Sequence, residues 1–174
     1  PFFDKASINT LYLEFKENQK IDRNELILNL VENGYDSSDL VTKPSSYALR
    51  GSVMDIFPSN SKYPIRIDLD DDLISSISIF DTDTQKTLRK INSFIVRPSR
   101  GFVLNINSIK IFKKNWRSRF KDDGEVFESV SKGKFISGIE FYSSLFYDEK
   151  PSLKDYLNGF NIFIVGDVKS ESKN

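Results

Sequence analysis

Apolar and polar residues alternate along several short stretches of the first hundred residues. Over residues 10–15, for example, Leu11, Leu13 and Phe15 fall on one side of an extended chain. A period of two is typical of a strand that buries one face. The stretches that we expect to form strands are residues 10–15, 39–43, 47–57, 65–70, 73–80 and 91–96, with turns at 58–62 and 81–84.

Other stretches have helical spacing. Asp22 and Glu25 have the spacing of a capping box, and Gly34 follows as a stop, so we expect a helix over residues 23–33. A second apolar stripe, with steps of three or four residues, predicts a helix over residues 106–121. Its members are Ile106, Ile109, Phe112, Trp116 and Phe120.

One helix followed by a run of antiparallel strands predicts an α+β domain, mainly an antiparallel sheet with one packed helix. We expect this domain over residues 22–97, after an entry segment at 1–21. Residues 98–174 differ in character and predict a separate segment. Within it we expect a short helix at 125–130, an aromatic-rich core segment at 138–146, a strand at 161–165 and a frayed polar tail at 169–174.

Composition supports a folded core and narrows the partners. Hydrophobic residues make up 39% of the 174 residues, and Lys+Arg and Asp+Glu balance at 25 each. Zero net charge argues against nucleic acid as the main partner. No acidic residue interrupts residues 105–121, however. The basic helix 106–121 therefore keeps a nucleic-acid-binding module open as an alternative to a solvated face over a buried stripe.

The same composition indicates an intracellular chain. There is no Cys, no apolar run of membrane-spanning length and no signal peptide, so we expect a cytoplasmic protein without a membrane partner. The chain begins with Pro1 rather than Met, which suggests a piece of a longer protein.

Residue types also exclude most enzyme chemistry. With no His and no Cys, the chain has neither His-dependent triads nor the usual zinc sites. It has no phosphate-binding loop motif. Asp68, Asp70, Asp71 and Asp72 form an acidic cluster, but Leu73 stands where an EF-hand needs Gly, so we interpret it as a surface turn. We expect no catalytic residue, cofactor, metal or small-molecule substrate, and no ATP hydrolysis.

One ordered set of motifs resembles a known family. The run Tyr47-Ala-Leu-Arg-Gly-Ser-Val-Met-Asp-Ile-Phe-Pro58 is followed by Tyr63-Pro-Ile-Arg-Ile-Asp-Leu69 and Phe80-Asp-Thr-Asp-Thr-Gln85. These segments resemble the UvrB-homology region of bacterial transcription-repair coupling factors (Mfd). The segments Asn115-Trp-Arg117 and Gly138-Ile-Glu-Phe-Tyr142 extend the likeness and separate it from the UvrB excision-repair helicase, which remains an alternative.

The resemblance implies a function. It implies a UvrB domain 2-like fold at about 22–97, followed by part of a helicase-like domain 1B at 98–174. In this family domain 2 is the face that binds UvrA, the damage sensor, and so recruits it to stalled RNA polymerase; other domains contact the polymerase and DNA. The family's interface positions correspond to Arg50, Arg66 and Asp70, the last replacing a usual Phe.

The residues themselves make the two arginines plausible contacts. Alternation places both opposite an apolar face made of Leu49, Val53, Phe57, Ile65, Ile67 and Leu69. Pairing Phe57 with Tyr63 in a hairpin predicts an ion pair between Arg50 and Asp70. We expect Arg50→Ala and Arg66→Ala to weaken UvrA binding without disturbing the fold. Asp55 falls on the core face and needs partners that the sequence does not name.

Overall fold

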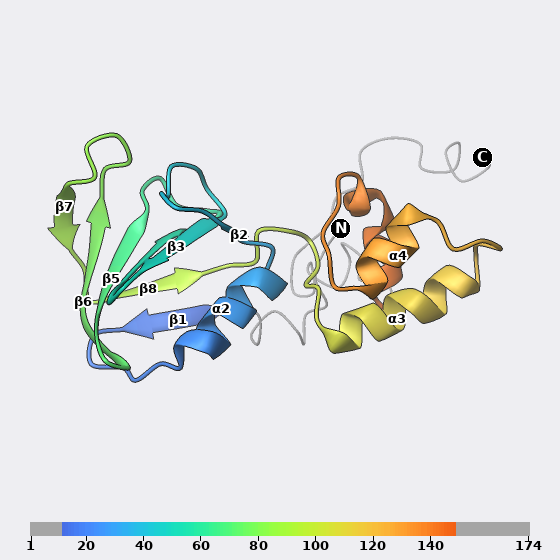
Figure 1. The fold of residues 1–174 in the computed structure, drawn as a ribbon, viewed down its shortest axis with the longest axis horizontal. Coiled ribbons are helices and arrows are strands. Elements are labelled where there is room, and N and C mark those ends of the chain that lie inside the picture. Colours follow the sequence, from blue (N-terminus) through green and yellow to red (C-terminus); the bar gives the residue numbers. More distant parts are fainter. Residues whose placement is uncertain (1–11, 149–174) are drawn as a thin grey trace, which may run out of the picture.

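The structure, a computed structural model, describes residues 12–148. Within this range a sheet unit (residues 12–96) and a helical unit (residues 105–148) are joined by a connecting segment, residues 97–104 (Figure 1). The α+β class expected from the sequence is confirmed. The predicted strand at 161–165 and the polar tail lie outside the described residues.

The sheet unit contains a six-stranded and a two-stranded sheet. The larger sheet has the order β2-β3-β4-β5-β6-β7, and each neighbouring pair is antiparallel except β2–β3, which is parallel. Its strands are β2 (Asp36–Ser37), β3 (Ser46–Arg50), β4 (Val53–Phe57), β5 (Ile65–Asp70), β6 (Leu73–Phe80) and β7 (Thr87–Lys90). The smaller sheet pairs β1 (Leu13–Lys16) with β8 (Ser93–Val96).

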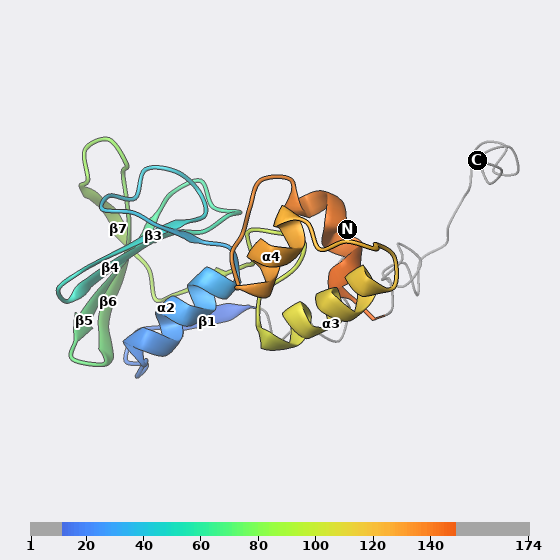
Figure 2. The same cartoon turned by 45° about the vertical axis from the view of Figure 1, so that its right-hand side comes forward.

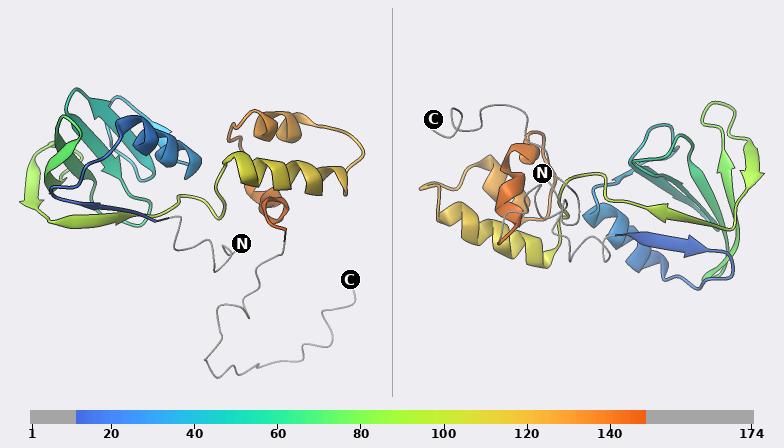
Figure 3. Two further views of the ribbon diagram at one scale, coloured as in Figure 1. Left: turned by 90° about the horizontal axis from the view of Figure 1, so that it is seen from below. Right: turned by 180° about the vertical axis from the view of Figure 1, so that it is seen from behind.

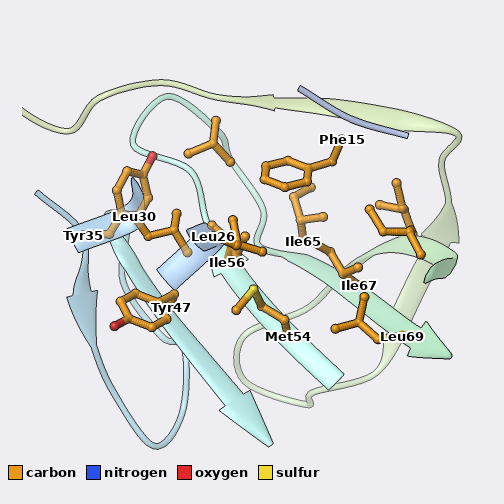
Figure 4. Close-up of a cluster of buried hydrophobic side chains, with 13 residues drawn as sticks. Phe15, Leu26, Leu30, Tyr35, Tyr47, Met54, Ile56, Ile65, Ile67 and Leu69 are labelled. Carbon is orange, nitrogen blue, oxygen red and sulfur yellow. The ribbon is translucent and has the colours of Figure 1, made fainter. Parts of the chain in front are cut away.

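One face of the large sheet is covered by α2 (Arg23–Glu32), as Figure 2 shows, and by the β1–β8 pair, which is labelled in Figure 1. The Asp22 carboxylate caps α2 by accepting from two backbone N–H groups, and Gly34 follows with φ +82°, as the sequence predicts. Leu26 and Leu30 of α2 and Phe15 of β1 meet the sheet residues in one core, where Figure 4 shows them together. The sheet side of that core consists of Tyr47, Met54, Ile56, Ile65, Ile67, Leu69, Ile74 and Ile77.

Two strand predictions need correction, and one strand was not predicted. Residues 47–57 form two strands rather than one, because the chain reverses at the two-residue loop Gly51-Ser52, where Gly51 takes the left-handed conformation. Residues 39–43 form no strand. Val41 is buried there because its side chain packs with Ala48, Phe57 and Phe80 on the second face of the sheet. The strand that was not predicted is β7, whose four residues are all exposed and therefore show no alternation of buried and exposed positions.

The helical unit has a core of its own. Its elements are α3 (Ile106–Arg117), α4 (Glu125–Ser131) and a 3-10 helix, η1 (Ile139–Phe146). Phe112 of α3 and Phe102 of the connecting segment both stack on Phe146, with ring centroids 4.8 and 4.2 Å away. Phe112 and Trp116 are buried as the stripe predicts, but Ile106 is exposed and Phe120 lies beyond the end of the helix.

The connecting segment leads from β8 into α3 and is held against the end of α2 (Figure 3). Backbone N–H groups of Ser99 and Leu104 donate to the carbonyls of Asn33 and Glu32, and the Ser99 hydroxyl donates to the carbonyl of Gly34. These bonds satisfy carbonyls that a helix end leaves without intrahelical partners. The segment is therefore joined to the sheet unit by specific bonds.

Candidate partner-binding site

The second face of the six-stranded sheet, which α2 does not cover, contains a buried acidic residue. Asp55 of β4 has a side chain with 0% exposure. The strand register places Ala48 on one side of it and Arg66 on the other. A carboxylate that is removed from water requires charged or hydrogen-bonding partners. Two arginines supply them, so the partners of Asp55 are now identified.

Arg66 makes two of the three hydrogen bonds between these arginines and Asp55. Its guanidinium binds Asp55 in a fork, with Nε 2.7 Å from Oδ1 and Nη2 2.8 Å from Oδ2. This geometry gives direction as well as charge to the contact. Hydrogen bonding to Asp55 is the main cause that raises the pKa of Arg66 above its ordinary value. Arg66 is thus a permanent cation held by its own strand neighbour.

Two further groups fix the Arg66 guanidinium from the other side. Its plane lies over the Phe80 ring, with Cζ 4.3 Å from the ring centroid. The backbone carbonyl and side-chain amide oxygen of Gln85 each accept a hydrogen bond at 3.3 Å. Gln85 adopts φ +58° after a turn in which Asp81 accepts from Thr84. The loop between β6 and β7 is therefore shaped to close around Arg66, whose side chain is only 19% exposed.

Arg50 shares the same carboxylate but remains open. Its Nη2 lies 2.6 Å from Oδ2 of Asp55, and 46% of its side chain is exposed. Arg50 stands at the end of β3, opposite Val53, so its guanidinium reaches back to Asp55 at the rim of the face. Among residues 12–148, Asp55 engages one of its nitrogens, which leaves the other donors open to a partner. We call the surface formed by Arg50, Asp55, Arg66 and Asp68 the arginine face.

The alternation of faces differs from the prediction along β4. Arg50 and Arg66 do share a face opposite the main core, as expected. Val53 and Phe57, expected on the core face, lie on the arginine face instead. A two-residue hairpin loop puts Arg50 and Val53 directly opposite each other, so the parity of the core positions changes at the loop.

The predicted ion pair between Arg50 and Asp70 is wrong. The hairpin between β4 and β5 pairs Asp55 with Arg66 and Met54 with Ile67, one residue away from the expected register. Arg50 lies on β3, not opposite β5, and its carboxylate partner is Asp55. Asp70 is exposed at the end of β5, and within residues 12–148 its side chain has no ion-pair partner.

The acidic cluster forms the tight turn between β5 and β6. Asp71 adopts φ +52° there, and Asp68 accepts a 2.5 Å hydrogen bond from the Ser76 hydroxyl across the hairpin. Among the described residues no group of three acidic side chains is arranged to hold a metal ion. No helix in this part of the chain is long and apolar enough to cross a membrane.

The chain matches one family model and a consistent set of relatives. The model describes the UvrB interaction domain and covers residues 13–102, which includes both sheets and the arginine face. The transcription-repair-coupling factor of Haemophilus influenzae is 35% identical over 156 residues, 87% of this chain. The factor of the same name from Escherichia coli K12 is 32% identical over 166 residues, 92% of this chain.

A UvrABC system protein B also matches. The protein from Kosmotoga olearia is 30% identical over 173 residues, 88% of this chain. The aligned part covers 14% of the length of each coupling factor named above and 26% of this protein. The chain therefore belongs to the UvrB interaction domain family, in a region that matches transcription-repair coupling factors along most of its length.

Proposed function

We propose that the arginine face binds UvrA, and that through it a transcription-repair coupling factor recruits UvrA to stalled RNA polymerase. The observation that carries the proposal is the shared carboxylate. Asp55 holds two arginines from different strands side by side on the sheet face that α2 leaves uncovered. The family's interface motifs map onto the same two arginines, and the family match spans them.

The charge of this arrangement suits a polar protein partner. The two arginines exceed the charge of Asp55 by one, and Asp68 on the same face offsets that excess, so the four charged groups balance. Arg is favoured at protein interfaces because its planar fork pairs bidentately with carboxylates. A partner carboxylate could accept hydrogen bonds from the remaining N–H groups of Arg50, because the bond to Asp55 already orients its guanidinium.

The two arginines have different roles in this proposal. Arg50 is half exposed and contacts UvrA directly, whereas Arg66 is mostly enclosed by Asp55, Phe80 and Gln85 and acts as a positioning residue. Asp70, at the edge of the same hairpin, replaces the aromatic residue usual in the family. It presents charge where relatives present apolar area, which makes UvrA binding more sensitive to salt.

The resemblance to the same family also suggests how the chain is divided into domains. We assign residues 22–97 to the UvrB domain 2-like module, 1–21 to its entry segment and 98–174 to part of a helicase-like domain 1B. In the longer protein, contacts to RNA polymerase and DNA belong to other domains.

The test is calorimetric titration of the whole chain with UvrA from the same cell. Arg50→Ala should weaken binding by about 1–4 kcal/mol if Arg50 is a hot spot. Arg119→Ala is the control, because Arg119 is likewise an exposed arginine but lies on the helical unit. Equal affinities for the wild type, Arg50→Ala and Arg119→Ala would remove the arginine face from the interface.

A further inference from the structure

The outer face of α3 carries an exposed aliphatic side chain among cations. Ile106, the first residue of the helix, is 85% exposed, and Ile109 is only partly buried. Steps of three or four residues along a helix share one face, so Lys110 and Lys113 lie beside them. A hollow of about 550 Å³ follows this face, and we call it the α3 hollow. Its lining residues are Ile106, Ile109, Lys110, Lys113, Lys114, Arg117 and Ser131.

The positive charge of the hollow is only partly balanced. Lys114 pairs with Asp148 at 2.8 Å, and the Arg117 guanidinium lies 5.5 Å from the centroid of the Phe127 ring. Lys110 and Lys113, by contrast, have no carboxylate within ion-pair distance in the described part of the chain. Two unmatched cations therefore flank an exposed isoleucine.

We propose that the α3 hollow docks a short acidic segment of a partner protein. An aliphatic side chain of that segment lies against Ile106 and Ile109, and its carboxylates face Lys110 and Lys113. Burying Ile106 in this way removes its apolar surface from water, and the adjacent lysines select an acidic partner over a basic one. The surface lies outside the matched family domain, which ends at residue 102, and is separate from the arginine face.

A protein segment fits this surface better than a nucleic acid does. A phosphate backbone offers charge but no aliphatic group to cover Ile106. The chain as a whole has no net charge, so no long-range positive field gathers nucleic acid. An amphipathic peptide that lays an apolar stripe into a hollow satisfies both the aliphatic and the cationic groups.

The experiment uses the 174-residue chain and a fluorescent synthetic peptide made of Leu and Glu in amphipathic helical order. Fluorescence anisotropy should show binding that weakens about tenfold in Ile106→Ser, because the buried apolar area is lost. The double variant Lys110→Glu/Lys113→Glu should weaken it by a similar factor. Lys134→Glu, an exposed lysine of the same unit outside the hollow, should leave binding unchanged.

Several results would overturn the proposal. One is a Leu–Lys peptide that binds as tightly as the Leu–Glu peptide, and another is Ile106→Ser binding the Leu–Glu peptide as the wild type does. Duplex DNA that binds through Lys110 and Lys113 irrespective of Ile106 would identify a phosphate-binding surface instead. Sedimentation that shows self-association abolished by Ile106→Ser would identify a second copy as the occupant. Because Ile106 is exposed, circular dichroism should show that the variant folds.

Discussion

Replacing Arg66 by Met tests whether the buried carboxylate depends on the arginine that binds it through two hydrogen bonds. Asp55 is completely buried, and Arg66 provides two of the three hydrogen bonds that its oxygens accept from arginines. Removing one partner of a buried ion pair costs about 3–5 kcal/mol. This is a large part of the roughly 5–15 kcal/mol that stabilises a typical domain. The sequence alone predicted that the fold tolerates the loss of Arg66. From the structure we expect the opposite, because Arg66 is the main partner of the buried Asp55.

The measurement is urea unfolding followed by far-ultraviolet circular dichroism, which reports on the sheet. Stability falls by about 1–3 kcal/mol per molar urea for small proteins, so Arg66→Met should lower the midpoint by about 2 M. Fluorescence of Trp116, the single tryptophan of the sequence, follows the helical unit separately.

Two control variants separate charge burial from simple loss of contact. Arg50→Met removes a half-exposed partner while Asp55 keeps Arg66, so it should cost about 1 kcal/mol or less. The double variant Asp55→Leu/Arg66→Met removes both buried charges and should recover most of the lost stability. The reasoning fails if Arg66→Met unfolds at the wild-type midpoint, or if the double variant is as unstable as the single one.

Three further variants test other features. Asp70→Phe should tighten UvrA binding about tenfold by restoring apolar contact area, and calorimetry that finds weaker binding would contradict this role. Burial raises the pKa of the Glu32 carboxyl at the end of α2, so its ionised form is penalised in the folded chain and stability falls as the pH rises through that pKa. Glu32→Gln should therefore melt at a higher temperature at neutral pH, and the gain should vanish near about pH 4, below the unfolded pKa. Gly34→Ala should destabilise more than Gly51→Ala in thermal unfolding. Both positions have positive φ, but a Cβ at Gly34 would lie 2.7 Å from the Ser99 hydroxyl oxygen whereas nothing lies within 4 Å of one at Gly51; equal losses would contradict this close approach.

The sequence predicted the elements that bury one regular face. Helix α2 with its Asp22 cap, strands β5 and β6, and helix α3 all have clear periodicity, because half of each element lies in a core. It did not predict β7, whose residues are all exposed, nor the reversal at Gly51, because Gly and Ser there lie within an otherwise strand-like run. Ile106 was misassigned because it is the first residue of α3 and extends past the core that Phe112 fills.

Two residues of the arginine face, Arg50 and Arg66, were predicted from the sequence, but the contacts that join them were not. Arg50 and Arg66 were correctly expected to share one face, since each alternates with core residues of its own strand. Their pairing with Asp55 depends on register, and a register depends on loop length between strands rather than on the pattern within them. The burial of Asp55 was evident from alternation, although the parity argument behind it assigned the carboxylate to the wrong face.

The shared carboxylate also couples the evolution of two of the three positions, Asp55 and Arg66, and leaves Arg50 outside that coupling. A change at Arg66 alone leaves the buried Asp55 with only the half-exposed Arg50, and a change at Asp55 leaves the mostly enclosed Arg66 without its counter-ion. Substitutions at these two positions should therefore be found together as the domain diverges. Arg50 is not constrained in this way, because Asp55 stays paired with Arg66 when Arg50 is replaced. The exposed arginine is consequently the one free to change when the partner surface changes.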